Sequence, residues 1–338
     1  MFEKYDNQKI LITGGLGFIG STLAHHLLKY TTNITLVDSL IPSYGGNLFN
    51  IDTIKDQVGV NITDMRDENS MNVLVRDCDI IFNLAGTLSH IDSICNPITD
   101  LDINCRSHLT ILESCRHYNP DVKIVFSGTR SQYGRVQYLP VDENHPMHPT
   151  DINGVNNVAG ESYHILYHKI YGMRICSLRL TNTYGPRHQM KHSKQGYLNW
   201  FLRLAMEGQT IPIFGEGLQR RDLNYVDDVV EALMLVGVSE DSNGEIFNLG
   251  SGEPITLLDS LKMIIDVVGR GDYVFKEFPE EKKQIEIGDY YANYDKVKHA
   301  LGWTPKTTLR QGLEQSLAFY TEHGSQYWSK NEVERLIK

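Results

Sequence analysis

The chain lacks the features of a membrane-spanning, secreted or metal-binding protein. No apolar run among its 338 residues reaches the length of a bilayer span, and no signal-peptide pattern opens it. The five cysteines are scattered, odd in number and without a C-x-x-C pair. Such cysteines argue against a metal site and favour reduced thiols. We therefore expect a cytoplasmic protein with no metal and no membrane partner.

Positive charge is also scarce. The sequence has 32 Lys and Arg against 42 Asp and Glu, which gives a formal net charge of −10. Surfaces that bind nucleic acid need clustered Lys and Arg, so no nucleic-acid partner is expected. Apolar residues, by contrast, make up 41% of the chain, which is enough to bury a full core at this length.

The most informative stretch runs from Ile10 to Asp38. Its first apolar run is typical of a buried parallel strand, and glycines follow directly at 14, 17 and 20. Gly14 allows a tight turn, Gly17 lets the backbone approach a pyrophosphate, and Gly20 lets a helix pack closely on the strand. A second apolar run ends at Asp38, whose carboxylate can accept hydrogen bonds from ribose hydroxyls and repel a 2′-phosphate. This order predicts a site for NAD.

Strands and helices alternate along most of the chain, which predicts an α/β fold with a Rossmann-type, doubly wound parallel sheet. We expect an NAD-binding domain over residues 1–186, with a strand near 220–250 returning to its sheet. Residues 187–338 are expected to form a smaller, mixed region that binds the substrate. Such a region would pack over the carboxyl ends of the strands, where ligands bind in open α/β sheets.

Beyond this fingerprint, the chain resembles the extended short-chain dehydrogenase/reductase family, specifically its nucleotide-sugar epimerases and dehydratases. The segments that carry the resemblance, in chain order, are Ile12–Gly20, Thr63–Asp67, Asn83–Gly86, Arg179–Arg187, Arg220–Asp228, Asn248–Gly252 and Leu301–Pro305. The resemblance implies NAD as cofactor and a nucleotide-diphosphate sugar as substrate, with a UDP-sugar as the commonest case. It also implies a homodimer formed through helices near 102–118 and 154–171, in which Ile111, Leu112, Ile165 and Leu166 are either interface or core residues.

The resemblance also implies which residues bind the two ligands. The expected cofactor-binding residues are Gly14, Gly17, Phe18, Ile19, Gly20, Asp38, Ser39, Asp64, Met65, Leu84, Ala85 and Asn157. The expected substrate-binding residues are Tyr133, Asn182, Arg187 and Arg221. A planar guanidinium meets phosphate bidentately, which suits the arginines to a diphosphate; surface ion pairs are the alternative role for them.

The usual catalytic pair of this family is missing. In the family, a tyrosine takes the proton of a sugar hydroxyl, and a lysine four residues later lowers the pKa of that tyrosine. The segment Pro149–Glu161 aligns without a gap and places Asn153 and Asn157 at these positions. An amide cannot take up a proton, so Asn153 could only orient a hydroxyl and Asn157 could only bond the cofactor ribose.

Other groups must then supply the acid–base chemistry. Thr129 takes the Ser/Thr position of the family at the end of a strand. His90 follows the cofactor turn and could act as base, because a histidine has a reference pKa of about 6.5; a partly exposed loop histidine is the alternative. Arg130 could stabilise an alkoxide or form a structural ion pair.

We therefore predict an NAD-dependent nucleotide-sugar epimerase or 4-oxidoreductase that works through a 4-ketosugar with a non-standard acid and base. Arg130 and Ser131 stand where the dehydratases carry an acidic pair, which disfavours a 4,6-dehydratase. The alternative from another class is a catalytically silent protein that binds NAD and a sugar nucleotide.

Overall fold

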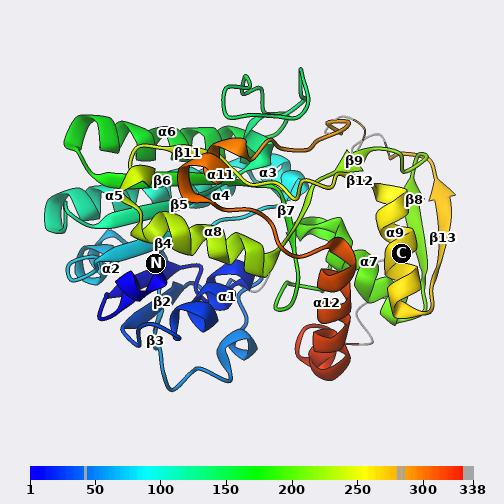
Figure 1. The fold of residues 1–338 in the computed structure, drawn as a ribbon, viewed down its shortest axis with the longest axis horizontal. Helices are drawn as coiled ribbons and strands as arrows, with labels where there is room; N and C mark the ends of the chain where they lie inside the picture. Colours follow the sequence, from blue (N-terminus) through cyan, green and yellow to red (C-terminus); the bar gives the residue numbers. More distant parts are fainter. Residues whose placement is uncertain (42–43, 280–282, 284–285, 330–338) are drawn as a thin grey trace.

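A seven-stranded parallel sheet forms the centre of the molecule (Figure 1). The computed structural model describes residues 1–41, 44–279, 283 and 286–329. The strands follow the order β11-β6-β5-β4-β1-β2-β3. Their bounds are β1 Ile10–Thr13, β2 Ile34–Asp38, β3 Gly59–Ile62, β4 Ile80–Asn83, β5 Lys123–Thr129, β6 Arg174–Leu180 and β11 Ile246–Asn248. This confirms the predicted Rossmann-type, doubly wound sheet, and β11 is a strand from the 220–250 segment that pairs with β6 at the sheet edge.

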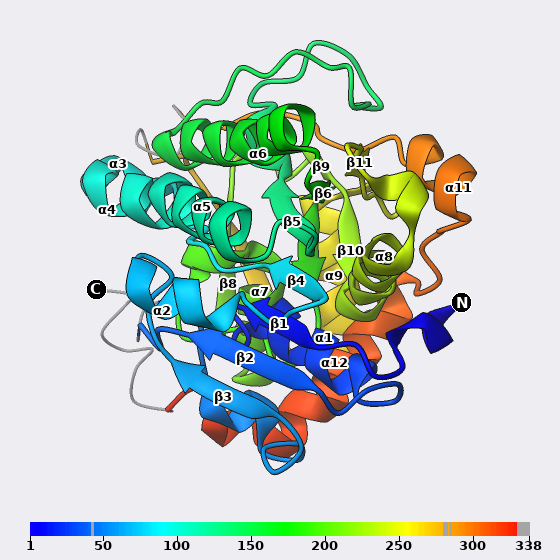
Figure 2. The same ribbon diagram turned by 90° about the vertical axis from the view of Figure 1, so that its left-hand side faces the viewer.

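Helices cover both faces of the sheet (Figure 2). One face carries α2 (Glu68–Leu74), α5 (Ser107–Tyr118) and α6 (Ile152–Tyr171), and the other carries α1 (Phe18–Leu27) and α8 (Val226–Val238). Strand β1 shows why both faces need cover. Ile10 and Ile12 pack into the core cluster on the side of α1 and α8, whereas Leu11 packs into the cluster of α2, α5 and α6.

A smaller layer built after residue 186 lies at one end of the sheet (Figure 1). Its helices are α7 Tyr197–Met206, α9 Leu257–Val268 and α12 Leu309–His323, whereas α11 Asp295–Leu301 lies beside β11 at the edge of the large sheet. Its strands are β8 Thr210–Phe214, β9 Arg220–Arg221, β10 Leu223–Tyr225, β12 Ile255–Thr256 and β13 Asp272–Lys276, with β7 Asn182–Tyr184 pairing to β10. Over the described residues, no helix is both long and apolar enough to cross a membrane.

Two helices begin close to the site. Helix α1 begins at Phe18, directly after the glycine turn. The helix expected near 102–118 is not continuous: a π-helical turn, Asp102–Arg106, joins the short helix α4 (Pro97–Leu101) to α5. Such turns are frequent at functional sites, and this one contains Asn104, whose amide bonds to the neighbouring loop.

Burial separates core residues from possible interface residues among Ile111, Leu112, Ile165 and Leu166. Ile111 and Leu112 of α5 are fully buried in the core, so they cannot belong to a dimer interface. On α6, Leu166 is 45% exposed and Ile165 is half-buried. An outward apolar surface therefore lies on α6 rather than on this part of α5.

Two buried histidines meet at the end of β4. Nδ2 of Asn83 lies 3.1 Å from Nδ1 of His108 and 3.2 Å from Nε2 of His164. Burial is the main reason why the pKa of His108 falls to about 3 and that of His164 to about 4. Since the amide nitrogen of Asn83 can only donate, both histidines must keep those ring nitrogens unprotonated.

The low pKa values of these two histidines predict that the protein loses stability in mild acid. An unfolded histidine takes up a proton near pH 6.5, whereas the folded pair stays neutral to about pH 4. The unfolded state therefore binds more protons between these values, and the free energy of unfolding falls as the pH is lowered. Each histidine should contribute about 1 kcal/mol per pH unit.

Chemical denaturation at pH 7.0 and 5.0 measures this effect. His164→Gln should lose less stability between the two pH values than the wild type. His117→Gln removes an exposed histidine of α5 and should match the wild type. Equal losses in all three proteins would contradict the assignment.

Candidate functional site

A cleft at the carboxyl ends of β1, β2 and β4 contains nearly all the expected cofactor residues. Its lining includes every one of them except Asn157. The glycine turn fits close backbone contact: a Cβ at Gly20 would lie 2.3 Å from the carbonyl oxygen of Gly14, and a Cβ at Gly14 would lie 3.0 Å from Cα of Ala85. The contact at Gly20 excludes any Cβ, and Gly14 has both a tight contact and a φ of 65°, which favours glycine.

The N-terminus of α1 opens into this cleft. Its N-cap is Gly17, which has no side chain to bond the first N–H groups of the helix. Free N–H groups and the positive end of the helix dipole attract an anion such as a pyrophosphate. The glycine turn and the uncapped helix therefore fit the pyrophosphate of a dinucleotide.

Asp38 ends β2 at the adenosine side of the cleft. The amides of Leu16 and Leu40 donate to its two oxygens at 3.1 and 2.9 Å. Burial raises the pKa of Asp38, while these two hydrogen bonds act in the opposite direction. Each oxygen keeps a second lone pair, so the carboxylate can still accept from two ribose hydroxyls.

Asp64, expected beside the adenine ring, forms a bidentate ion pair with Arg66. The Nε and Nη2 atoms of Arg66 lie 2.9 and 2.6 Å from the two carboxylate oxygens. Hydrogen bonding from Arg66 is the main cause that lowers the pKa of Asp64. Met65 is buried beneath it at 6% exposure.

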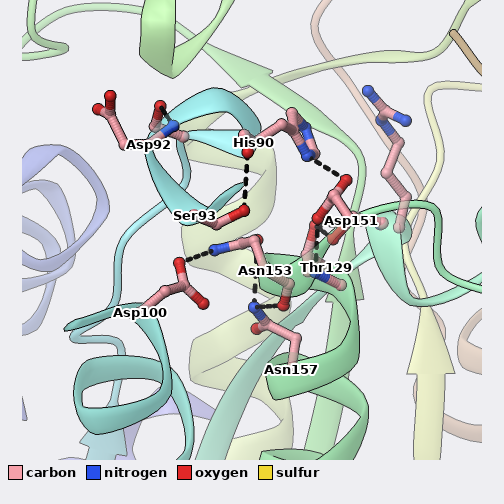
Figure 3. A network of polar contacts seen from close by, with 12 residues as sticks. His90, Asp92, Ser93, Asp100, Thr129, Asp151, Asn153 and Asn157 are labelled. Atoms are coloured by element: carbon pink, nitrogen blue, oxygen red, sulfur yellow. Dashed lines mark hydrogen bonds and ion pairs between the residues drawn. The ribbon is translucent and has the colours of Figure 1, made fainter. Parts of the chain in front are cut away.

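The two asparagines expected at the positions of the usual tyrosine and lysine are turned into the protein. Asn153 is 1% exposed, and its Nδ2 donates to the carbonyl oxygen of Thr87 at 2.7 Å and to Oδ2 of Asp100 at 3.1 Å. Nδ2 of Asn157 donates to the backbone oxygen of Asn153 at 2.9 Å (Figure 3). The side-chain amide of Asn153 therefore forms its hydrogen bonds within the protein and is not available to a substrate hydroxyl.

Asp100 is the centre of this polar cluster. It is 4% exposed, and its carboxylate also accepts from Oγ1 of Thr87 at 3.0 Å, Nδ2 of Asn104 at 3.0 Å and Nδ2 of Asn156 at 2.7 Å. A buried carboxylate needs such donors to replace water. The amide at 153 is thus one of four side chains that satisfy Asp100.

His90 lies at the start of α3 (His90–Cys95) and pairs with Asp151. Its Nδ1 lies 2.7 Å from Oδ2 of Asp151, which also caps α6 by accepting from the Gly154 amide at 2.8 Å. Burial alone would raise the pKa of Asp151, but the hydrogen bond and charge of His90, the amide of Gly154 and the charge of Arg130 together outweigh it and lower that pKa. An ionised carboxylate only accepts, so Nδ1 carries the proton and Nε2 is the basic nitrogen.

Thr129 is the last residue of β5 and lies beside this pair, and Arg130 follows it in the chain (Figure 3). Oγ1 of Thr129 accepts from the amide of Ser131 at 3.3 Å, and its own proton remains available to donate. Arg130 forms no ion pair within the described residues; its Nε donates to Oδ1 of Asn182 at 3.2 Å. Of the two roles left open for Arg130, the structural ion pair is therefore wrong.

Two of the four expected substrate residues contact other side chains of the protein. Tyr133 is fully buried, and its hydroxyl joins Asn248 and Arg179 at 2.7 Å each, so it is a core residue. Arg187 has a φ of 72° and places its guanidinium 5.6 Å from the ring centre of Phe319 in α12. The expected contact of Tyr133 with substrate is therefore wrong, whereas Arg187 is half-buried and its contact with substrate stays a prediction.

Arg221 and Asn182 remain as candidates for the diphosphate. Arg221 is 7% exposed and donates to Oε1 of Glu286 at 2.7 Å and to the carbonyl oxygen of Gly288 at 2.6 Å. Asn182 receives the bond from Arg130 described above. In the parts of the chain that the structure describes, no group of three or more His, Cys, Asp or Glu side chains could hold a metal.

Sequence reasoning missed Asp151, Asp100 and Glu286. Asp151 carried a local signal, because Asp three residues before Gly154 at the start of a helix is an N-cap pattern. Its contact with His90, 61 residues away, has no such signal. The partners of Asp100 and Glu286 are likewise set by the tertiary fold.

Known proteins share this architecture. The profile of the NAD dependent epimerase/dehydratase family matches residues 10–250. A Methanocaldococcus jannaschii protein, provisionally assigned as a UDP-glucose 4-epimerase, is 34% identical over 90% of this chain and 96% of its own. The UDP-glucose 4-epimerase of Thermotoga maritima, solved with UDP-glucose, is 29% identical with a TM-score of 0.85, over 93% of this chain and 98% of its own. That of Thermus thermophilus, solved with NAD, is 27% identical with a TM-score of 0.82, over 92% and 98%.

The Asp100 cluster predicts that introducing tyrosine and lysine at 153 and 157 will destabilise rather than activate the protein. Asn153→Tyr with Asn157→Lys removes a donor from Asp100 and forces a larger ring into a site that is 1% exposed. We expect a loss of about 2–4 kcal/mol in the free energy of unfolding.

Thermal and chemical denaturation measure that loss. Val155→Tyr introduces the same ring on the same helix at a position 50% exposed, and should change stability little. A double variant as stable as the wild type, with new turnover of sugar nucleotides, would contradict the structural role assigned to Asn153.

Proposed function

Because this chain belongs to the NAD dependent epimerase/dehydratase family, we propose that it oxidises and re-reduces the sugar of a UDP-sugar at C4, with His90 as the proton acceptor. The relatives named above act on UDP-glucose, and one was solved with it, which supports UDP as the nucleotide. The observation that carries the proposal is the His90–Asp151 pair, which lies beside the first turn of α6, where the usual tyrosine is absent.

The pair has the chemistry that the reaction needs. Asp151 fixes Nδ1 of His90 as the donor, which leaves Nε2 to take the proton of the sugar hydroxyl and later return it. The hydroxyl of Thr129 donates a hydrogen bond to the same sugar oxygen. Acceptance and return of hydride is the chemistry that NAD supplies when bound. With both transfers reversed on the opposite sugar face, the product is the epimer and no net oxidation occurs.

Asn153 has a positioning role in this proposal. It holds the carbonyl of Thr87, three residues before His90, from the same helical turn that carries Asp151. The loop that ends in His90 is thus tied to α6 at two points. The Oδ1 atom of Asn157 accepts a hydrogen bond from a ribose hydroxyl of the cofactor, as the family resemblance implies.

A second candidate is a silent protein that binds NAD and a sugar nucleotide without turnover. The absence of both usual catalytic side chains favours it. An epimerase should interconvert two sugars without accumulating NADH, an oxidoreductase should accumulate the ketosugar, and a silent protein should do neither. Product analysis with a panel of UDP-sugars, together with absorbance at the NADH band, distinguishes the three.

Removing the proposed base should abolish turnover without abolishing binding. We expect His90→Gln to lower kcat about 10²–10⁴-fold, the usual worth of a general base. Asp151→Asn should also lower kcat strongly, because an amide favours the wrong tautomer of His90, while asparagine still caps α6. NAD affinity should change little in either variant.

Two controls sharpen this test. His117→Gln changes an exposed histidine of α5 and should keep full activity. His90→Gly should regain part of its activity with added imidazole, because the side chain at 90 is 36% exposed and so accessible. Full activity of His90→Gln would eliminate His90 as the base.

The homodimer is proposed from the exposed apolar side chains of α6. Leu166 and Ile170 are 45% and 61% exposed, and Tyr171 at the helix end is 50% exposed. A dimer through this helix would cover them.

Light scattering with size exclusion measures the assembly. We expect Leu166→Asp with Ile170→Asp to yield monomers, whereas Val73→Asp, at an exposed apolar position on α2, should leave the dimer intact. A monomeric wild type would refute this interface.

A further inference from the structure

The protein satisfies the guanidinium of Arg130 only in part. Its Nε is held by Oδ1 of Asn182 at 3.2 Å, and its guanidinium carbon lies 5.4 Å from the ring centre of Tyr290. Among the described residues, neither of its terminal amino groups has a hydrogen-bond or ion-pair partner. The side chain is therefore fixed in direction while its two strongest donors remain free, which is the state of an arginine prepared for an anion.

Arg221 differs from Arg130, because a carboxylate of the protein already binds its guanidinium. Oε1 of Glu286 lies 2.7 Å from Nη2, and Nη1 donates to the carbonyl oxygens of Arg220 and Gly288 at 2.9 and 2.6 Å. The side chain of Arg221 is 8% exposed, and that of Glu286 is 30% exposed. The carboxylate therefore sits on the solvent side of a buried guanidinium, where a phosphate oxygen would also bind.

The two arginines contact the same short segment, Gly288–Tyr290. Arg221 donates to the carbonyl oxygen of Gly288, Arg130 lies over the ring of Tyr290, and the amide of Tyr290 donates to the carbonyl oxygen of Arg220 at 3.1 Å. Burial first, and then the charge of Arg221, lower the pKa of Arg130 to about 10, while Glu286 acts in the opposite direction. With Glu286 in place, the three side chains carry a net charge of +1. Without it they carry +2, which matches the two negative charges of a diphosphate.

We propose that Arg130 and Arg221 together bind the diphosphate of the substrate, and that Glu286 occupies the Arg221 half of this site until the diphosphate displaces it. This inference rests on the proposed function, because it assigns the anion of the same sugar nucleotide. It makes Glu286 an internal competitor, so removing its charge should strengthen binding. Loss of an ordinary binding residue would have the opposite effect.

Calorimetry on the full-length protein, with UDP and inorganic pyrophosphate as probes, tests the sign of this effect. Glu286→Gln should bind both probes about threefold to tenfold more tightly than the wild type, as expected for loss of a partly exposed ion pair. Arg130→Gln should bind both about tenfold more weakly or worse. Glu277→Gln removes an exposed carboxylate beyond the end of β13 and should leave both affinities unchanged.

Each other outcome has a definite meaning. If UDP binds equally to all four proteins, the inference is wrong and the proposed substrate class stands. If NAD binds but no form binds UDP or pyrophosphate, both are wrong. If Arg130→Gln loses affinity for UDP-glucuronate but not for UDP, Arg130 reads a sugar carboxylate, and the diphosphate assignment is overturned. Tighter UDP binding by Glu286→Gln in a protein without turnover would support the inference and reject the catalytic proposal.

Discussion

A buried carboxylate, Asp100, is the constraint on which the arrangement of this site depends. Its residue is only 4% exposed, so donors of the protein must replace most of the water around it. They come from the loop after β4, the π-helical turn before α5 and the first turns of α6, through Thr87, Asn104, Asn153 and Asn156. The same four side chains thus join three segments that are far apart in sequence, and their donors hold the rim of the site in one position.

This constraint explains why an amide stands at position 153. A phenol there has one proton to donate and a large ring to place, whereas the asparagine amide donates to both Asp100 and the Thr87 carbonyl. Asp151, the N-cap of α6 and two residues before Asn153, forms a hydrogen bond with His90 of the neighbouring loop, and we propose that this pair takes over the acid–base function. In the proposed mechanism the base has therefore moved from the helix to the loop that the helix holds.

Sequence pattern predicted the parts of the molecule that depend on local geometry. Buried strands, the glycine turn and the acid at the end of β2 each have a short-range signature, and together they identified the sheet and the cofactor cleft. Side chains whose direction depends on long-range packing were predicted less well. Tyr133 turned out to face the buried Arg179, and Arg187 turned toward α12, because a motif fixes the backbone position of a residue but not the direction of its side chain.

The sequence by itself determined the fold and the position of the dinucleotide turn, because both depend on residue types at fixed spacing, and it predicted Asn153 and Asn157 at the positions of the usual catalytic pair. Only the tertiary structure showed that His90 contacts Asp151 and that Glu286 pairs with Arg221. His90 and Asp151 are 61 residues apart, and Arg221 and Glu286 are 65 apart. Contacts at such separation depend on how whole elements pack, and no local propensity encodes them.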